Sequence, residues 1–229
     1  MTDLLFRDDP MLDQCEATVI GVTPAGVILD RTVFYPAGGG QPGDTGTLDE
    51  AIVRDTIRDD DGSVLHVCEG ELPVEGETVT ASLDWERRHL HMRMHTALHL
   101  LSVAIPLPVT GGAIGAEKSR LDFDMPEAPE DRDAIERMLN EMIGADHPVT
   151  EEWITDEELA ANPGLVKTMS VQPPKGQGRV RLVRIGEIDL QPCGGTHVAS
   201  TAGIGPVRLG KIEKKGRQNR RVSIHLAGD

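Results

Sequence analysis

Four potential metal ligands, in two short segments about a hundred residues apart, constrain the fold of this chain more than any other feature. His95 and His99 are four residues apart, so on a helix both imidazoles lie on one face, about one turn from each other. Cys193 and His197 flank two glycines, which let the backbone fold tightly. Three nitrogens and one sulfur make a tetrahedral set that favours zinc over calcium or magnesium. The sequence therefore predicts a zinc site that joins the two segments.

Each pair of ligands is a weak signal by itself, and the alternative is a set of core histidines beside an inert buried thiol. Four protein ligands are typical of structural zinc, whereas catalytic zinc keeps one position open, so the sequence leaves both roles open. Thr96 follows His95, so the HExxH motif of zinc proteases is missing. No Ser-His-Asp motif is visible, which disfavours an acyl-enzyme route. Zinc that lowers the pKa of water would instead suit direct attack on an ester.

Residue patterns predict two domains and an α+β fold. Residues 1–83 are rich in β-branched residues and tight turns, which predicts a small antiparallel β-barrel or sandwich. Within it, residues 35–46 contain five glycines, so this loop is either a rigid turn or a close approach of the backbone to a ligand. Residues 84–229 are predicted to form the second, zinc-binding domain. Its main helix begins near Asp84, a good N-cap, and ends near Val103.

Further elements are predicted within the second domain. Residues 129–143 are expected to form an amphipathic helix. Four apolar residues form its expected inner face: Ile135, Met138, Leu139 and Met142. Thr155 begins a capping-box pattern for a short helix, and residues 164–177 are expected to be a connector. Residues 207–214 and 220–226 are expected to pair as a C-terminal hairpin.

The chain is acidic overall, with a net charge of −15, but its basic residues concentrate toward the C-terminus. Residues 165–229 contain 12 Lys/Arg and 4 Asp/Glu, which predicts a localised anionic partner; the alternative is a solvated basic surface. Three cysteines are too few for a disulfide framework. No basic leader and no apolar run long enough for a bilayer is visible. These features predict a cytoplasmic protein.

Taken together, the motifs resemble the freestanding alanyl-tRNA editing proteins of the AlaX type, which are relatives of the editing domain of alanyl-tRNA synthetase. The resemblance rests on both ligand segments and on several flanking stretches, which occur in the family's order. These matching stretches are residues 34–41, 95–101, 118–124, 193–198, 201–205, 211–216 and 219–222. The glycine-rich N-terminal region and the lack of a long C-terminal extension resemble the medium-length subgroup.

This resemblance implies a small β-barrel-like N-terminal domain followed by an α+β editing core, in which the zinc-bearing helix packs on an antiparallel sheet. It implies that zinc is surrounded by four residues: His95, His99, Cys193 and His197. It also implies hydrolysis of the ester in mischarged tRNA(Ala), chiefly seryl and, for the glycine-rich subgroup, glycyl. Thr96 stands where related synthetase editing domains often have Ser, a departure that should not disturb the metal.

The expected substrate is polyanionic, and the C-terminal third offers basic side chains for its phosphates. The candidates are Lys211, Lys214, Lys215, Arg217, Arg220 and Arg221. A cavity that fits serine also fits alanine, so sparing correct alanyl-tRNA requires groups that bond only the serine hydroxyl. Thr96 and Thr196 are candidates for that contact, with capping of a helix or turn as the alternative. Gln41 is a candidate for contact with the acceptor end or for support of the core.

Two other functions remain open at this point. One is a tRNA-binding module with structural zinc and no turnover. The other, a weaker alternative, is a zinc hydrolase that acts on a small ester or amide. The complete ligand set and the basic C-terminal region favour the deacylase. The sequence does not specify the oligomeric state, the preferred mischarged amino acid, or whether zinc activates water or positions the substrate.

Overall fold

The computed structural model describes residues 2–167 and 178–228, and these form two compact units, Met1–Leu90 and His91–Asp229. The division between the units falls within one long helix, whereas the sequence places a domain boundary between residues 83 and 84; that boundary stays a prediction. Most of the expected connector at residues 164–177 lies outside the described residues. Among the helices of the described ranges, none has the length and apolar character needed to cross a membrane.

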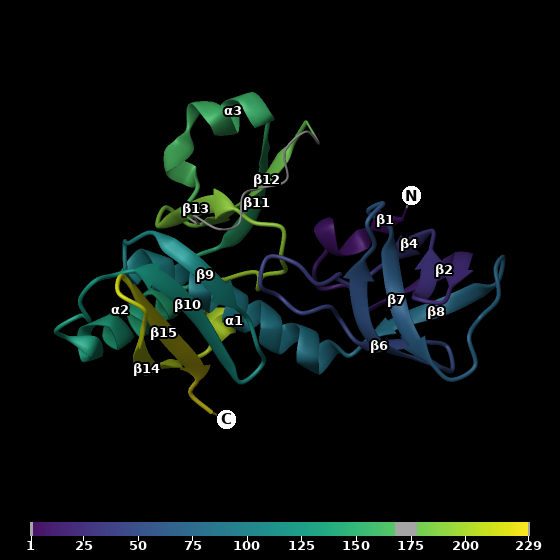
Figure 1. The fold of residues 1–229 in the computed structure, drawn as a ribbon, viewed down its shortest axis with the longest axis horizontal. Helices are drawn as coiled ribbons and strands as arrows, with labels where there is room; N and C mark the ends of the chain where they lie inside the picture. Colours follow the sequence, from purple (N-terminus) through teal and green to yellow (C-terminus); the bar gives the residue numbers. More distant parts are fainter. Residues whose placement is uncertain (1, 168–177, 229) are drawn as a thin grey trace. The chain divides into compact units, whose positions relative to one another are not determined.

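The first unit is a closed antiparallel β-barrel, which confirms the predicted barrel-like architecture (Figure 1). Its strands lie in the order β2–β3–β7–β6–β5–β8. Their bounds are β2 Gln14–Thr23, β3 Gly26–Leu29, β5 Gly46–Leu48, β6 Ala51–Arg58, β7 Val64–Glu69 and β8 Thr78–Leu83. Two short strands, β1 (Asp3–Leu4) and β4 (Arg31–Thr32), pair in parallel beside it. Inward-facing aliphatic residues such as Val27, Leu29 and Leu48 fill the barrel, because alternate residues of a strand face opposite sides.

The glycine-rich loop packs tightly against the barrel at two of its glycines. A Cβ atom at Gly43 would collide with the carbonyl oxygen of Thr56, and one at Gly46 would collide with that of Ser82. Between them, Asp44 accepts a hydrogen bond from the backbone N–H of Tyr35 at 2.6 Å. These contacts favour the rigid-turn interpretation for this end of the loop.

Helix α1 (Trp85–Ala104) begins where the sequence predicts, after Asp84, whose carboxylate accepts the N–H of Arg87 at 3.1 Å. The guanidinium of Arg88 is fully buried and pairs with Asp44 of the glycine-rich loop. It also donates to the carbonyl oxygens of Pro10 at 3.2 Å and Val33 at 2.7 Å. The first turns of α1 are therefore fixed to the barrel, which explains why they belong to the first unit.

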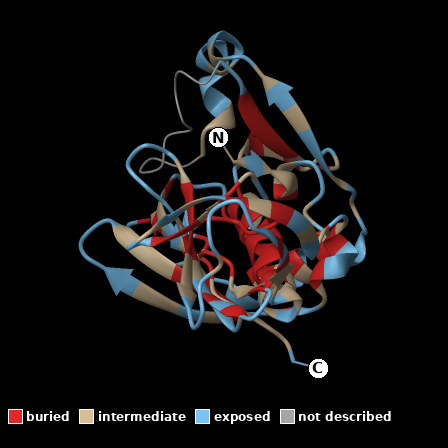
Figure 2. Cartoon of the chain, turned by 90° about the vertical axis from the view of Figure 1, so that its right-hand side faces the viewer, coloured by how far each residue is buried: buried red, intermediate tan, exposed pale blue. Residues whose placement is uncertain are grey.

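The second unit combines two antiparallel sheets with the rest of α1. One sheet has the order β14–β15–β10–β9 and the other β11–β12–β13. The strand bounds are β9 Val109–Ala113, β10 Lys118–Asp124, β11 Val149–Ile154, β12 Val180–Ile185, β13 Asp189–Pro192, β14 Val207–Lys215 and β15 Asn219–Leu226. Strands β14 and β15 form the predicted C-terminal hairpin. Figure 2 shows the buried residues of the chain toward the inside, and the exposed residues on loops and on parts of the strands and helices.

Two short helices complete the second unit. Helix α2 (Arg132–Gly144) begins after Asp131, which caps it by accepting the N–H of Ala134 at 2.8 Å. Its buried residues are Ile135, Leu139 and Ile143. The prediction that Met138 faces inward is wrong, because Met138 is 45% exposed; the buried stripe follows a spacing of four residues. Helix α3 (Asp156–Ala161) has the predicted capping box at Thr155.

One buried histidine inside the barrel was not anticipated from the sequence. His66 of β7 donates through Nδ1 to the carbonyl oxygen of Val27 at 3.0 Å. Its Nε2 accepts a hydrogen bond from the hydroxyl of Thr32 at 2.8 Å. The hydroxyl oxygen of Thr32 in turn accepts a hydrogen bond from the backbone N–H of Phe34 at 3.0 Å. Burial disfavours the charged ring and lowers the pKa of His66 from 6.5 to about 4, although the hydrogen bond to the Val27 carbonyl acts in the opposite direction.

The barrel is therefore expected to lose stability as the pH falls from 6.5 to about 4. In this window the unfolded chain binds a proton at His66 and the folded barrel does not, so acid favours unfolding, by about 3 kcal/mol at the lower limit. Stability is complete above pH 6.5 and declines below it. Hydrogen-exchange protection of β7 amides, compared between wild type and His66→Gln, checks this. Equal pH dependence in both proteins would contradict the prediction.

Candidate metal centre

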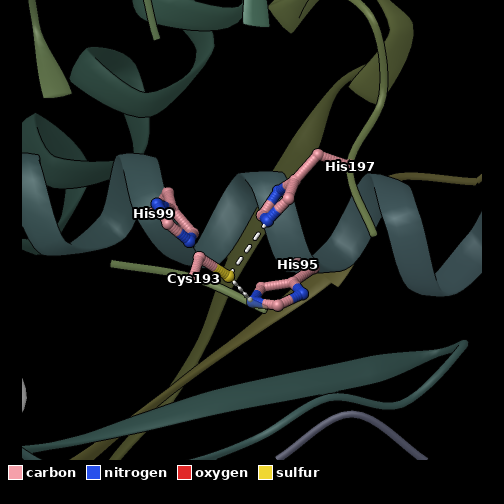
Figure 3. Close-up of side chains that lie close together, drawn as sticks. All are labelled: His95, His99, Cys193 and His197. Atoms are coloured by element: carbon pink, nitrogen blue, oxygen red, sulfur yellow. Dashed lines mark hydrogen bonds between the residues drawn. The ribbon is translucent and has the colours of Figure 1, made fainter. Parts of the chain in front are cut away.

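The four predicted ligands lie together in the second unit, as Figure 3 shows. His95 and His99 project from α1, and Cys193 and His197 come from the segment that follows β13. The sulfur of Cys193 lies 3.4 Å from Nε2 of His95 and 3.2 Å from Nε2 of His197. All four ligand atoms lie within 4.8 Å of one another.

This geometry fits a tetrahedral metal site. Zinc bonds of about 2.3 Å to sulfur and about 2.0 Å to nitrogen place a sulfur and a nitrogen ligand about 3.6 Å apart. The two sulfur–nitrogen distances, 3.4 and 3.2 Å, are close to that value. The three imidazole rings also converge, with centroids 4.3 Å apart for His95 and His197 and 4.8 Å apart for His99 and His197. The cluster therefore has the donor types and the spacing that a metal ion such as zinc requires.

The close packing of the ligands changes their acid–base behaviour. Burial alone raises the pKa of the Cys193 thiol, but the charges and hydrogen bonds of His95 and His197 outweigh it and hold that pKa well below 9.0. Burial and the positive charge of His95 lower the pKa of His197 to about 3. For His99, burial lowers the pKa, but hydrogen bonds and charges of Asp189 and Cys193 outweigh it and raise it to about 9. The cluster thus favours a thiolate, which is the form that binds metal.

Two of the histidines are oriented by hydrogen bonds behind the cluster. Nδ1 of His99 donates to the carboxylate of Asp189 at 3.0 Å. Nδ1 of His197 lies 3.1 Å from the hydroxyl oxygen of Thr96, whose single proton goes to the carbonyl oxygen of Met92 at 2.9 Å. Nδ1 of His197 must therefore be the donor. When these rings are neutral, as metal binding requires, Nε2 carries the lone pair and faces the other ligands, the arrangement typical of metal-bound histidine.

The carboxylate of Asp189 is the centre of a buried polar network. The side chain of Asp189 is fully buried at the start of β13. Besides the bond from His99, its carboxylate accepts hydrogen bonds from Nζ of Lys167 at 2.5 Å and from Nε2 of Gln191 at 2.7 Å. Nε2 of Gln191 also donates to the hydroxyl oxygen of Ser102 at 3.1 Å. Sequence reasoning missed Asp189. The available signal was an acidic residue on a short strand just before the Cys193 segment.

The other predicted site residues lie in different settings. Thr96 is fully buried, and its oxygen also accepts the N–H of Val198 at 3.3 Å, which supports a positioning role. Thr196 is fully buried between the ligands Cys193 and His197 in the chain. Gln41 lies in the first unit, where its backbone pairs with Gly38 across the glycine-rich loop. Direct contact of these three side chains with a substrate stays a prediction.

The predicted phosphate-binding residues fall into two groups. Arg221 on β15 makes two hydrogen bonds to Asp122 of β10, at 2.8 and 2.9 Å, so its charge is already compensated. Arg220 donates to the carbonyl oxygens of Asn219 and Pro126. The remaining four are exposed along β14 and at the turn that follows it: Lys211, Lys214, Lys215 and Arg217. The exposed group is the better candidate for an anionic partner.

Replacing Thr96 by Val should lower the affinity of the cluster for a metal ion such as zinc about 10–100-fold, the usual cost of removing a hydrogen-bond partner of a metal-binding histidine. The change deletes the acceptor for Nδ1 of His197 and for the N–H of Val198. Thr96→Ser keeps the hydroxyl and is the matched control, expected to bind like wild type. Competition against a chromophoric chelator measures the affinities. Wild-type affinity in Thr96→Val would contradict the positioning role.

Comparison with known proteins connects this cluster to a family. Residues 180–223 match the family described as the threonyl and alanyl tRNA synthetase second additional domain, and residues 8–87 match class II (A) tRNA synthetases. The chain is 34% identical to the alanyl-tRNA editing protein AlaX-M of Methanosarcina acetivorans, over 99% of both proteins. It is 36% identical to AlaX-L of Pyrococcus horikoshii, over 98% of this chain and 58% of that protein. It is also 35% identical to the alanine–tRNA ligase of Thermococcus kodakarensis, over 93% of this chain and 24% of the ligase. The chain therefore belongs to the AlaX family of alanyl-tRNA editing proteins.

Proposed function

We propose that this protein is a zinc-dependent deacylase that hydrolyses the ester of mischarged tRNA(Ala), with seryl-tRNA(Ala) and also glycyl-tRNA(Ala) as substrates. The observation that carries the proposal is the convergence of His95, His99, Cys193 and His197 in a chain that matches editing proteins over its full length. Those relatives are named for the editing of alanyl-tRNA. We extend the same activity, and a cytoplasmic location, to this chain.

In this proposal the four ligands hold zinc, and the surrounding residues hold the ligands. Bound zinc supplies a positive charge that favours deprotonation of water and polarises a carbonyl group. Asp189 keeps Nε2 of His99 directed at the centre, and Thr96 does the same for His197. Rigid ligands of this kind reduce the reorganisation needed during reaction.

The partial exposure of Cys193 favours a catalytic site over a sealed structural one. Structural zinc is closed by four ligands, whereas catalytic zinc must be reached by water and substrate. His95, His99 and His197 keep 8%, 7% and 4% of their surface exposed, and Cys193 is half-buried. Several residues of α1 next to them, such as Leu100, are fully buried. Cys193 is the most exposed of the four candidate ligands, and in this proposal water and substrate reach the metal from its side.

Discrimination between serine and alanine requires a polar group that bonds the serine hydroxyl, because size alone does not exclude alanine. The hydroxyl of Thr96 already donates to Met92 and accepts from His197, so we assign it a positioning role. Thr196 remains our candidate for contact with the serine hydroxyl. Gln41 remains a candidate for contact with the acceptor end. Hydrolysis of glycyl-tRNA would require a second criterion besides hydroxyl recognition.

Purified protein should release serine from Ser-tRNA(Ala) and spare Ala-tRNA(Ala), and Cys193→Ala should lose both bound zinc and activity. The substitution removes the thiolate, the one ligand that does not come from a histidine. Release of labelled amino acid and zinc content are measured on the same preparation. Full activity in Cys193→Ala would reject the proposed site. A wild-type protein that binds one zinc per chain and tRNA, but hydrolyses neither substrate, would support the binding-module alternative.

The exposed cations near the β14–β15 turn are expected to bind the phosphates of the tRNA. Changing Lys214, Lys215 and Arg217 together to Gln should weaken tRNA binding at low salt and reduce the slope of log affinity against log salt by about two to three. Arg137→Gln on α2, which removes another exposed cation of the same unit, is the control. Filter binding over a salt series measures the slope. An unchanged slope in the triple variant would place the phosphates elsewhere.

A further inference from the structure

A buried arginine lies directly behind the ligand-bearing glycine segment. Arg181 is on β12, and its side chain is only 6% exposed. One guanidinium nitrogen, Nη1, donates to the carbonyl oxygens of Cys193 at 2.9 Å and Gly195 at 2.8 Å. The backbone oxygen of Arg181 accepts the N–H of Cys193 at 3.1 Å. Three hydrogen bonds from this single residue therefore hold the Cys193–Gly195 segment.

The other end of the guanidinium is fixed by a neighbouring strand. Nη2 pairs with the carboxylate of Glu151 on β11. Trp153 is the register partner of Arg181, and Glu151 lies two residues before Trp153, so the side chains of Glu151 and Arg181 share one face of the sheet. Strands β11 and β12 thus present the guanidinium to the Cys193 segment in one orientation.

Stability does not account well for this arrangement. A buried ion pair seldom stabilises a protein more than apolar packing of the same volume, because both charges must be removed from water. Nε of Arg181 is also buried and has no hydrogen-bond partner among the residues that the structure describes, which adds a cost. The planar guanidinium of arginine is suited instead to hydrogen-bonding several acceptors whose positions must stay fixed.

The segment that Arg181 holds contains two glycines, so its own side chains contribute little to fixing it. Gly194 and Gly195 carry no side chains, and a Cβ atom at Gly194 would meet nothing within 4 Å. Glycine loses more conformational freedom on ordering than any other residue, so this segment is costly to hold still. Metal bonds tolerate errors of only about 0.2 Å, so a small drift of the backbone would carry the sulfur of Cys193 out of range.

We propose that Arg181 is a positioning residue that locks the Cys193–Gly195 segment in its metal-binding conformation through the two carbonyl oxygens, with Glu151 holding the guanidinium in place. The inference rests on the proposed zinc site and assigns a further residue to it. Arg181 acts through the Cys193 segment. Loss of the Arg181 guanidinium should therefore weaken the bond between the Cys193 thiolate and the metal more than it lowers the stability of the fold.

The chain provides a matched control on the same two strands. Arg184 of β12 pairs with Glu152 of β11, in the same manner as Arg181 with Glu151, but its side chain is 32% exposed. Among the residues that the structure describes, the guanidinium of Arg184 hydrogen-bonds to Glu152 and not to the Cys193 segment. Arg→Lys at either position keeps the positive charge and loses the planar fork. A difference between the two variants therefore reports the fork of Arg181 and not the charge of the strand.

The test uses the full chain loaded with Co²⁺ in place of zinc. Arg181→Lys and Arg181→Met should lower the affinity for Co²⁺ about 10–100-fold and weaken the thiolate-to-cobalt charge-transfer band, while Arg184→Lys matches wild type. Thermal unfolding of the metal-free proteins is measured alongside. Should Arg181→Met not fold, Arg181→Lys decides the question.

Two contrary results have different meanings. Wild-type protein that binds no Co²⁺ would overturn the metal site and this inference with it. Wild-type protein that binds Co²⁺, with Arg181→Lys matching it in both affinity and band intensity, would overturn the role of Arg181 alone.

Discussion

The convergence of three imidazoles and one thiol in a small, largely buried space is the constraint on which the second unit depends. Each group has a lone pair or a proton that must find a partner, and burial removes water as that partner. The neighbouring imidazoles hold the pKa of Cys193 well below 9.0, whereas burial and His95 lower that of His197 to about 3. A single cation at the centre would satisfy all four donors at once.

Three of the four candidate ligands are held in place by residues from different elements. Thr96, on the same helix as His95, holds His197 across a separation of about a hundred residues in the chain. Asp189 of β13 holds His99, and Arg181 of β12 holds the backbone on both sides of Gly194. Since these supports come from one helix and two paired strands, the precision of the site depends on the pairing of β12 with β13 as much as on the ligands themselves.

The cluster of candidate ligands and the barrel were predictable from the sequence because their signals are local. The four-residue spacing of His95 and His99 requires only a helix, and alternating β-branched residues require only strands. Asp189 and Arg181 were missed because their roles depend on strand register, such as the pairing of Leu182 with Pro192. Met138 was misplaced because helical periodicity defines a stripe but tertiary packing selects which stripe is buried.

Helix α1 belongs to both compact units, since Arg88 is fixed within the barrel and His95 begins the metal cluster. A fragment that started at His91 would lose the Asp84 cap and the Arg88 anchor, and its short helix would begin with unpaired N–H groups. The histidine-bearing part of α1, taken without the barrel, would therefore form a weaker helix. The match to an alanine–tRNA ligase spans 93% of this chain, so it includes both the barrel and the metal cluster.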